Sequence, residues 1–379
     1  MIHNKILNDK KEKYNNSYIA SIIVPVSDNC TILEYFINHL TSTVCMNSYQ
    51  IIFVIDGPVN NIIIEILHKY SLEYSNICYA HLRKKTSYAH VNNYGRTLAK
   101  SDLLIFMNTD IFLQDNCLEI MIASLYQNKV HALQPLLIYP QNNRVQSTGH
   151  IFGDCFNRHA LKQQSINHPL VSKSSTRQAL SLALCLIPIS IFDECNGFDE
   201  YYYNGWEGLD LTLKISQKGY TCWYEAKAKA YHVEGGSRKK FSLNESLQAG
   251  HFWSKWGNIV NSDIIDLLKK QICNLSLSKD YIIFNFTTYR SWSIILNELH
   301  ISYVEIVDKT KYSNEYFLDF YNALSYQSLI NPNPLIFLVS SFSSLEDNNL
   351  WMKYRKNKED IFIDLSGNIG LLKNIVCGN

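Results

Sequence analysis

Gln50–Pro58 reads QIIFVIDGP, an unbroken apolar run of strand length that ends in an acidic residue and a Gly-Pro turn. Two further apolar runs lie on either side of it, Tyr18–Val26 (YIASIIVPV), which ends at a Ser-Asp-Asn turn, and Leu103–Asp110 (LLIFMNTD), which ends in Asn-Thr-Asp. Apolar runs without alternation are typical of strands buried on both faces, as in a parallel sheet covered by helices. The sequence therefore predicts an α/β fold. Helices are expected near Thr31–Leu40, Asn61–Tyr70 and Tyr88–Ala99, and a further strand at Ile77–Leu82.

The acidic residues of these runs fall where their strands end. In open α/β sheets, ligands bind outside the carboxyl ends of the strands. Asp56 and Asp110 both lie at such ends, a placement that a purely structural role explains poorly. They are the first candidate binding residues.

The strand–helix rhythm changes beyond about residue 130. His131–Tyr139 and Gln146–Phe152 read as two strands joined by a turn. A polar loop follows over 157–176, and a loop of this length is often a lid or a specificity element. From about residue 277 a β/α pattern restarts. We expect three parts, a flexible arm, a main domain and a smaller α/β domain of open role, over 1–17, 18–260 and 277–379.

The composition narrows the classes of function. The chain of 379 residues is 46% hydrophobic and 18% charged, which indicates a globular protein with room for two domains. Its net charge of +1 argues against a general nucleic-acid-binding protein. The ten cysteines are scattered and form no C-x-x-C pair. Together with a polar N-terminus that lacks an apolar signal-peptide core, they predict a reduced, cytoplasmic protein.

Two clusters of chemically useful residue types lie close together, WEGLD at 206–210 and YHVEGG at 231–236. Helical spacing places Glu207 and Asp210 on one face of a first helical turn. His232 returns after a short predicted strand. This layout would hold a cation and a proton acceptor side by side.

A structural interpretation of the same residues stays open. Asn204 and Glu207 have the spacing of a helix N-cap and its partner three residues on, so Glu207 could simply close a capping box. His232 could be a hydrogen-bonded core histidine. The strand that leads to it is expected at Thr221–Tyr224, after a helix that ends at Gly219.

Four blocks of sequence follow one another in a characteristic order. They are Ser21–Val26 (SIIVPV), Asn92–Asp110 (NNYG running on to NTD), Leu182–Glu200 (ending in NGFDE), and Glu207–Leu211 (EGLDL) with His232–Arg238 (HVEGGSR). Each block is weak alone. Their order and spacing over residues 18–260 resemble the family 2 glycosyltransferases of the GT-A fold, the group that contains bacterial rhamnosyl- and galactosyltransferases of surface polysaccharide synthesis.

The resemblance implies a GT-A fold, with a Rossmann-like mixed sheet, and a hard divalent cation between the phosphates of a nucleotide-sugar. That cation would be Mn²⁺ or Mg²⁺. The family's metal ligands correspond to Asp110, the last residue of its D-x-D motif, and to His232. Asn108 replaces the first aspartate of the motif, and its amide can still hydrogen-bond a ribose hydroxyl. The other donor-side residues that the resemblance implies are Asp56 for the nucleobase, Pro25, Val26, Asn93 and Arg238.

Inversion at the anomeric carbon needs a base within hydrogen-bond reach of the attacking hydroxyl. The usual position of that base in the family is Gly208 in this chain, which leaves Glu207 and Asp210 as candidates. Glu207 is the first choice, with Asp210 as its support or as an acceptor anchor, and the reverse assignment stays open. Trp206 would either pack under the acceptor sugar, because aromatic faces favour sugar C–H surfaces, or serve the core.

The implied enzyme is an inverting, metal-dependent transferase that moves a sugar from a UDP- or dTDP-sugar to a saccharide or lipid-linked saccharide acceptor. Its setting would be bacterial polysaccharide or lipopolysaccharide synthesis, in the cytoplasm or peripherally at the inner face of the membrane. The C-terminal domain could form a homo-oligomer. Gly208 motivates the alternative of a catalytically impaired nucleotide-sugar-binding or assembly protein. A nucleotidyltransferase is disfavoured because no glycine-rich phosphate loop follows the first strand.

Overall fold

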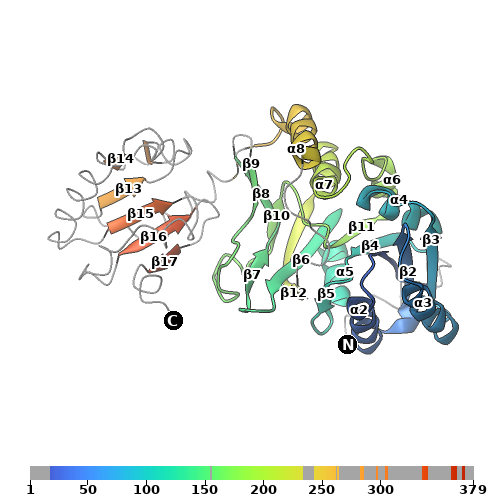
Figure 1. The fold of residues 1–379 in the computed structure, drawn as a ribbon. Helices are drawn as coiled ribbons and strands as arrows, with labels where there is room; N and C mark the ends of the chain where they lie inside the picture. The colour runs from blue at the N-terminus through green and yellow to red at the C-terminus, as the bar shows by residue number, and fades with distance from the viewer. Residues whose placement is uncertain are drawn as a thin grey trace. The chain divides into compact units, whose positions relative to one another are not determined.

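The computed structural model describes residues 18–153, 156–233, 243–261 and 263, together with short stretches of the C-terminal part. Those stretches are 282–285, 296–297, 304–305, 335–339, 360–364 and 369–371. The chain forms two compact units (Figure 1). The first comprises Met1–His150 and Ser165–Val260, and the second comprises Ile151–Gln164 and Asn261–Asn379. The arm predicted over residues 1–17 lies outside the described residues.

A ten-stranded mixed sheet forms the centre of the first unit. Its strands are β1 (Ala20–Val26), β2 (Tyr49–Asp56), β3 (Ile77–Leu82), β4 (Leu103–Met107), β5 (Ile111–Leu113), β6 (Ala132–Tyr139), β7 (Arg144–Ser147), β10 (Ser175–Arg177), β11 (Leu184–Pro188) and β12 (Cys222–His232). They follow the order β10-β12-β6-β11-β4-β1-β2-β3, with β5 paired to β12 and β7 paired to β6. The first four strands are parallel, as predicted, whereas β11 lies antiparallel between β4 and β6.

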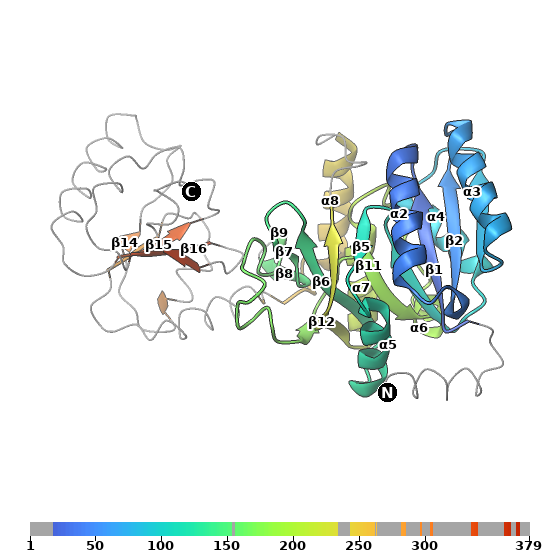
Figure 2. The same ribbon diagram turned by 90° about the horizontal axis from the view of Figure 1, so that it is seen from below.

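The helices of this unit cover both faces of the sheet (Figure 2). One face is covered by α2 (Cys30–Thr43), α3 (Asn61–Glu73) and α5 (Cys117–Gln127), and the other by α4 (Tyr88–Leu98), α6 (Ile189–Glu194) and α7 (Glu207–Gln217). The chain also forms the short 3-10 helix η1 (Met46–Ser48) and the helix α8 (Leu243–Trp256). No helix among the described residues is both long and apolar enough to cross a bilayer.

Side-chain caps fix where three of the predicted helices begin. Asn29 accepts a hydrogen bond from the Ile32 amide at the start of α2, and Ser87 accepts one from the His90 amide at the start of α4, both at 3.1 Å. Asn60 caps α3 in the same way. Such caps are each worth about 1 kcal/mol. They explain why these helices begin close to the predicted positions.

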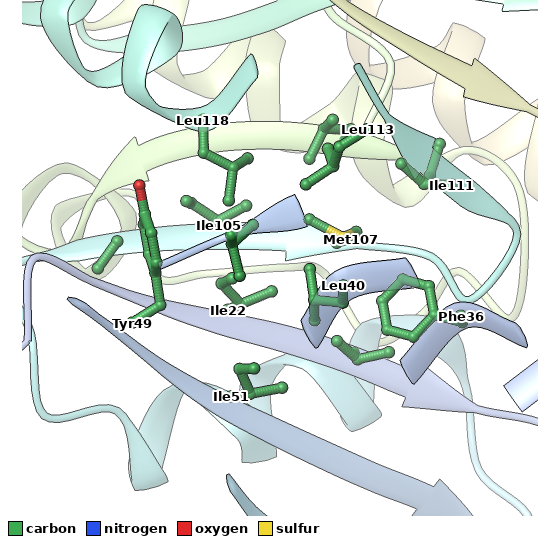
Figure 3. Close-up of a cluster of buried hydrophobic side chains, with 14 of the residues drawn as sticks. Ile22, Phe36, Leu40, Tyr49, Ile51, Ile105, Met107, Ile111, Leu113 and Leu118 are labelled. Carbon is green, nitrogen blue, oxygen red and sulfur yellow. The ribbon is translucent and has the colours of Figure 1, made fainter. Parts of the chain in front are cut away.

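Alternate residues of the buried strands supply two hydrophobic cores, one on each face. Ile22 belongs to the core under α2, α3 and α5, whereas Ile23 belongs to the core under α4, α6 and α7. Figure 3 shows the first core, where Phe36 and Leu40 of α2 and Leu118 of α5 lie over the strands. Burial on both faces is the reason for the unbroken apolar runs of the sequence.

β12 is longer than the strand predicted over Thr221–Tyr224, because it pairs first with β6 and then with β5. A bulge between Glu225 and Lys229 interrupts the β6 pairing. The buried Glu225 carboxylate accepts a hydrogen bond from the Ser124 hydroxyl of α5 (2.6 Å). The extension carries the chain on to His232, which the prediction had left beyond the strand.

The second half of the predicted polar loop is fastened to β12. The Tyr224 hydroxyl donates to the Val171 carbonyl (2.7 Å), and the Ser174 hydroxyl donates to Glu225 (2.9 Å). β10, which ends the loop, pairs antiparallel with β12. These contacts hold the part of the loop from Val171 onward against the sheet.

The predicted strand Gln146–Phe152 is divided between β7 and β8 (His150–Gly153), which pairs with β9 (Phe156–His159). The second unit contains a five-stranded sheet in the order β14-β13-β15-β16-β17. Its strands are β13 (Ile282–Asn285), β14 (Val304–Glu305), β15 (Leu335–Val339), β16 (Ile361–Asp364) and β17 (Ile369–Leu371). β13 to β16 pair in parallel, and β17 pairs antiparallel with β16.

Candidate active site

The carboxyl ends of β1, β2 and β4 lie at one edge of the sheet, as their parallel register requires. Pro25 and Val26 end β1, and Asp56 is the last residue of β2. Asn108 and Asp110 follow β4 directly. The strand topology therefore gathers five of the predicted donor-side residues at this edge.

The two predicted metal ligands meet where β5 pairs with β12. Ile111 pairs with His232, and the Val233 amide donates to the Asp110 carbonyl (3.1 Å). His232 Nε2 lies 3.2 Å from Asp110 Oδ1, and the two side chains are 13% and 17% exposed. On the other side of the ring, His232 Nδ1 lies 2.6 Å from Gln146 Oε1. Sequence reasoning missed Gln146, because a glutamine in a short strand carries no signal of such a contact.

The donor atoms of this pair fit a divalent cation. A carboxylate oxygen and an imidazole nitrogen are suitable ligands for Mn²⁺, and the carboxylate also suits Mg²⁺. Two ligands at right angles, each about 2.1 Å from an ion, are about 3.0 Å apart, close to the 3.2 Å between Nε2 and Oδ1. Among the described residues no group of three His, Cys, Asp or Glu side chains could hold a metal, so substrate phosphates and water would complete the coordination.

Tyr88 is a second residue that sequence reasoning missed. Its hydroxyl lies 3.2 Å from Asn108 Oδ1 and 3.2 Å from the Leu182 carbonyl oxygen. Burial, and to a smaller extent the negative charge of Glu207, raises the pKa of Tyr88. The hydroxyl therefore keeps its proton and acts as a donor beside Asn108. Nothing in the sequence distinguishes Tyr88 from an ordinary aromatic residue at a helix start.

Asp56 is held by the segment that follows β3. Its Oδ1 accepts hydrogen bonds from the Thr86 amide (2.7 Å) and hydroxyl (2.8 Å), and its Oδ2 pairs with Lys85 Nζ (2.7 Å). The side chain is 10% exposed. These partners hold the Asp56 carboxylate in one orientation, so a ligand must approach it in a matching direction to donate a hydrogen bond.

Asn93 organises the NGFDE segment. Its Nδ2 donates to the Phe198 carbonyl (3.0 Å) and to Glu200 Oε1 (2.9 Å), and its Oδ1 accepts from the Phe198 amide (3.0 Å). Gly197 has a φ of +61°, and a Cβ there would lie 2.7 Å from Asn93 Oδ1. The side chain of Asn93 thus supports the wall of the site through this segment, rather than through a described contact with the donor edge.

Glu207 is the first residue of α7 and is only 6% exposed. The capping box predicted with Asn204 does not form, because Trp206 occupies the N-cap position and makes no side-chain cap bond. Glu207 Oε2 instead accepts a hydrogen bond from the Gly205 amide (2.5 Å). The φ of +132° at Gly205 shows the sharp turn that places this amide against the carboxylate.

Asp210 is fully buried among cationic partners. Its Oδ1 accepts hydrogen bonds from Lys255 Nζ (2.5 Å) and Trp256 Nε1 (2.9 Å) of α8. Its Oδ2 lies 2.8 Å from Lys214 Nζ, one turn along α7. This network fastens α8 to α7, and it distinguishes Asp210 from Glu207, which the sequence pattern could not do.

Gly208 lies against Leu182. A Cβ at position 208 would approach Leu182 Cδ2 at 3.0 Å and its Cβ and Cγ at 3.1 Å. These distances are too short for an unstrained side chain unless Leu182 moves. Leu182 therefore fills the space in which the family's usual base would begin.

Trp206 packs against α8 beside Glu207. Its ring centroid lies 4.8 Å from that of Phe252 and 6.4 Å from that of Trp253. The indole is partly exposed. The indole therefore packs against α8 and leaves part of its surface accessible to a ligand. Arg238, the remaining predicted donor-side residue, lies outside the described residues.

Residues 21–181 match the family model described as Glycosyl transferase family 2. The chain is 23% identical over 235 residues to the O-antigen biosynthesis protein RfbC of Myxococcus xanthus, a match that covers 60% of this chain and 18% of that protein. The chain thus spans under a fifth of the length of this curated relative.

Two solved structures are also similar. GalNAc-T7 with UDP, GalNAc and Mn²⁺ has 12% sequence identity and a TM-score of 0.53, covering 84% of this chain and 59% of that one. TarS 1-349 of S. aureus has 11% identity and a TM-score of 0.39, covering 57% and 58%. The first likeness is one of fold, and the family match includes both Asp56 and Asp110. The chain therefore carries a glycosyl transferase family 2 domain, which residues 21–181 match.

Proposed function

We propose that this protein transfers a sugar, with inversion, from a UDP- or dTDP-sugar to a hydroxyl of a saccharide acceptor. The observation that carries the proposal is the Asp110–His232 pair at the carboxyl edge of the sheet, the edge at which β2 ends in Asp56. The related fold of GalNAc-T7 was solved with UDP, GalNAc and Mn²⁺, which is the class of ligands proposed for this site.

On the donor side, Asp110 and His232 would hold Mn²⁺ or Mg²⁺, which when bound offsets the negative charge of the leaving diphosphate. The fixed carboxylate of Asp56 would accept a hydrogen bond from the nucleobase. The backbone of Pro25 and Val26 would contact the base or the ribose from the neighbouring strand end.

Two further donor-side roles are proposed. The Asn108 amide would hydrogen-bond the ribose, with the Tyr88 hydroxyl, 3.2 Å away, orienting it. Arg238 would contact the donor phosphates from the segment that follows His232. Asn93 would act indirectly, by holding the Phe198–Glu200 segment that it bonds.

On the acceptor side, Glu207 is the proposed base. As the acceptor oxygen forms its bond to the anomeric carbon, its proton passes to Glu207, and the bond from that carbon to the diphosphate oxygen breaks on the opposite face. Asp210 is a poorer base because its carboxylate is fully buried and paired with two lysines. We assign it the supporting role. Trp206 would pack under the acceptor sugar.

The acceptor is proposed to belong to a bacterial surface polysaccharide, such as lipopolysaccharide, because the curated relative is an O-antigen biosynthesis protein. A lipid-linked saccharide at the inner face of the membrane would fit this role, with the protein bound peripherally. Sedimentation with anionic lipid vesicles checks that part, and complete absence of binding at low salt would exclude the peripheral location.

The decisive test combines donor binding with turnover. Asp110→Ala should abolish Mn²⁺-dependent hydrolysis and transfer of the donor sugar, and full activity would remove the metal assignment. Glu207→Gln should lose turnover but keep donor affinity in calorimetry, with Glu194→Gln, an exposed carboxylate pairing with Lys218, as the matched control. Donor binding by the wild type without turnover over a broad acceptor panel would instead favour the non-catalytic, nucleotide-sugar-binding alternative.

A further inference from the structure

Gln146 makes two contacts with a single residue, His232. Its Oε1 lies 2.6 Å from His232 Nδ1, and its Nε2 donates to the His232 carbonyl oxygen (3.4 Å). The second contact decides the orientation of the amide, because the reversed amide would set its own oxygen against that carbonyl oxygen. Oε1 is therefore the atom that faces the ring, and His232 Nδ1 must carry a hydrogen to donate to it.

This orientation determines which ring nitrogen faces Asp110. A neutral imidazole with its hydrogen on Nδ1 has a lone pair on Nε2. Nε2 lies 3.2 Å from Asp110 Oδ1, a second acceptor atom. Two acceptors this close repel each other unless a proton or a metal ion lies between them. The contact with Gln146 thus leaves two ligand atoms, Nε2 and Oδ1, 3.2 Å apart.

The strand pairing explains how Gln146 reaches the histidine. Val145 pairs with Ile138 of β6, whereas Ser147 pairs with Leu137, so Gln146 is the extra residue of a β-bulge in β7. On its other side, Ile138 pairs with Tyr231 of β12. Bulges redirect side chains and are frequent beside active sites. The bulge lies beside the paired residues Val145, Ile138 and Tyr231, and Tyr231 is the residue before His232. Gln146 is 3% exposed.

We infer that Gln146 is a positioning residue that fixes His232 as its Nδ1–H tautomer and so presents Nε2 as the ligand atom for the divalent cation. Only the naming of the cation rests on the proposed function. Partners of this kind orient a metal-binding histidine, and their loss weakens metal affinity by about 10- to 100-fold.

The test compares three variants of the full chain. Gln146→Leu keeps the size of the side chain but removes both contacts with His232. Gln146→Glu keeps an acceptor for Nδ1–H. Ser147→Ala is the matched control, because it removes a buried hydroxyl from the next residue of β7, which hydrogen-bonds to Gln134 and Gly149.

Two readouts are independent of turnover. The first is the tautomer of His232 in the metal-free protein, from long-range ¹H–¹⁵N NMR of ¹⁵N-histidine-labelled chain, with the signals identified by their loss in His232→Asn. The second is Mn²⁺ affinity from the EPR signal of the free ion. Gln146→Leu should shift His232 to the Nε2–H tautomer and bind Mn²⁺ about 10- to 100-fold more weakly. Gln146→Glu should keep the Nδ1–H tautomer, and Ser147→Ala should stay close to the wild type in both readouts.

An unchanged tautomer and affinity in Gln146→Leu would overturn the inference. Should that variant not fold, Gln146→Asn, whose amide is too short for both contacts, carries the same expectation. Sugar transfer enters neither readout. Absence of transfer by the wild type with the expected tautomer change would therefore count against the proposed function alone, and active wild type with no change would count against Gln146 alone.

Discussion

We predict that Asp210 stabilises the fold, whereas Glu207 acts as the base, and substitution of Asp210 can test this division of roles. Asp210→Asn keeps the shape of the side chain and removes its charge. The amide would then face two ammonium groups, Lys214 Nζ and Lys255 Nζ, which lie 2.8 Å and 2.5 Å from the carboxylate oxygens in the native protein. The contact from Trp256 Nε1 (2.9 Å) would lose its charged acceptor.

The size of the effect follows from burial. Breaking a buried ion pair by removing one partner costs about 3–5 kcal/mol. The carboxylate of Asp210 is fully buried, but the side chains of Lys214 and Lys255 are 20% and 32% exposed. Both lysines can turn their ammonium groups toward water, so we expect the lower end, about 3 kcal/mol. This loss is roughly a hundredfold change in the unfolding equilibrium constant.

Urea denaturation followed by circular dichroism measures that change, and single-turnover sugar transfer measures the chemistry. Asp210→Asn should lower the unfolding midpoint, whereas Glu207→Gln should unfold near the wild-type midpoint and lose about 10²- to 10⁴-fold in rate, the usual contribution of a general base. A wild-type midpoint for Asp210→Asn, together with a rate loss equal to that of Glu207→Gln, would refute the assignment and make Asp210 the base.

Three further changes test other parts of the structure. Gly208→Asp should lower the free energy of unfolding by about 1–3 kcal/mol through overpacking against Leu182. In a double-mutant cycle, Leu182→Ala in the same chain should restore part of this free energy. Gly197→Ala should destabilise by about 1–2 kcal/mol in urea titrations because its φ is positive. Burial raises the pKa of Glu225, but hydrogen bonds from the Ser124 hydroxyl, from a backbone amide and from other side chains outweigh it and lower the pKa. The resulting stabilisation is present above about pH 4.3 and is lost as the pH falls through the folded-state pKa, so Glu225→Gln should flatten the acid side of the stability profile.

The sequence was sufficient for the donor half of the fold because its strands are buried on both faces. Such strands leave unbroken apolar runs, and their polar ends mark the ligand edge. This reasoning found β1, β2 and β4 and placed Asp56 and Asp110 at one edge. The acceptor half was harder, because the length of β12 depends on pairing with β6 and β5, which are distant in sequence.

Contacts across the sheet also escaped the sequence pattern. Tyr88 and Gln146 meet Asn108 and His232 only after several strands have assembled, so no local spacing reports them. The capping box failed for a different reason. Its spacing was present, but the turn at Gly205 starts the helix later and gives Glu207 another partner.

The position of the antiparallel strand β11 has a consequence for folding during synthesis. Each of its residues pairs with β4, from Leu184 with Met107 to Pro188 with Leu103. A chain that emerges from the ribosome N-terminus first can pair β4 with β1, but the other edge of β4 stays open until β11 has been synthesised. That edge belongs to the uncharged run LLIFM, and an open apolar edge favours aggregation. Nascent chains that end between β4 and β11 should therefore be those that chaperones bind most strongly.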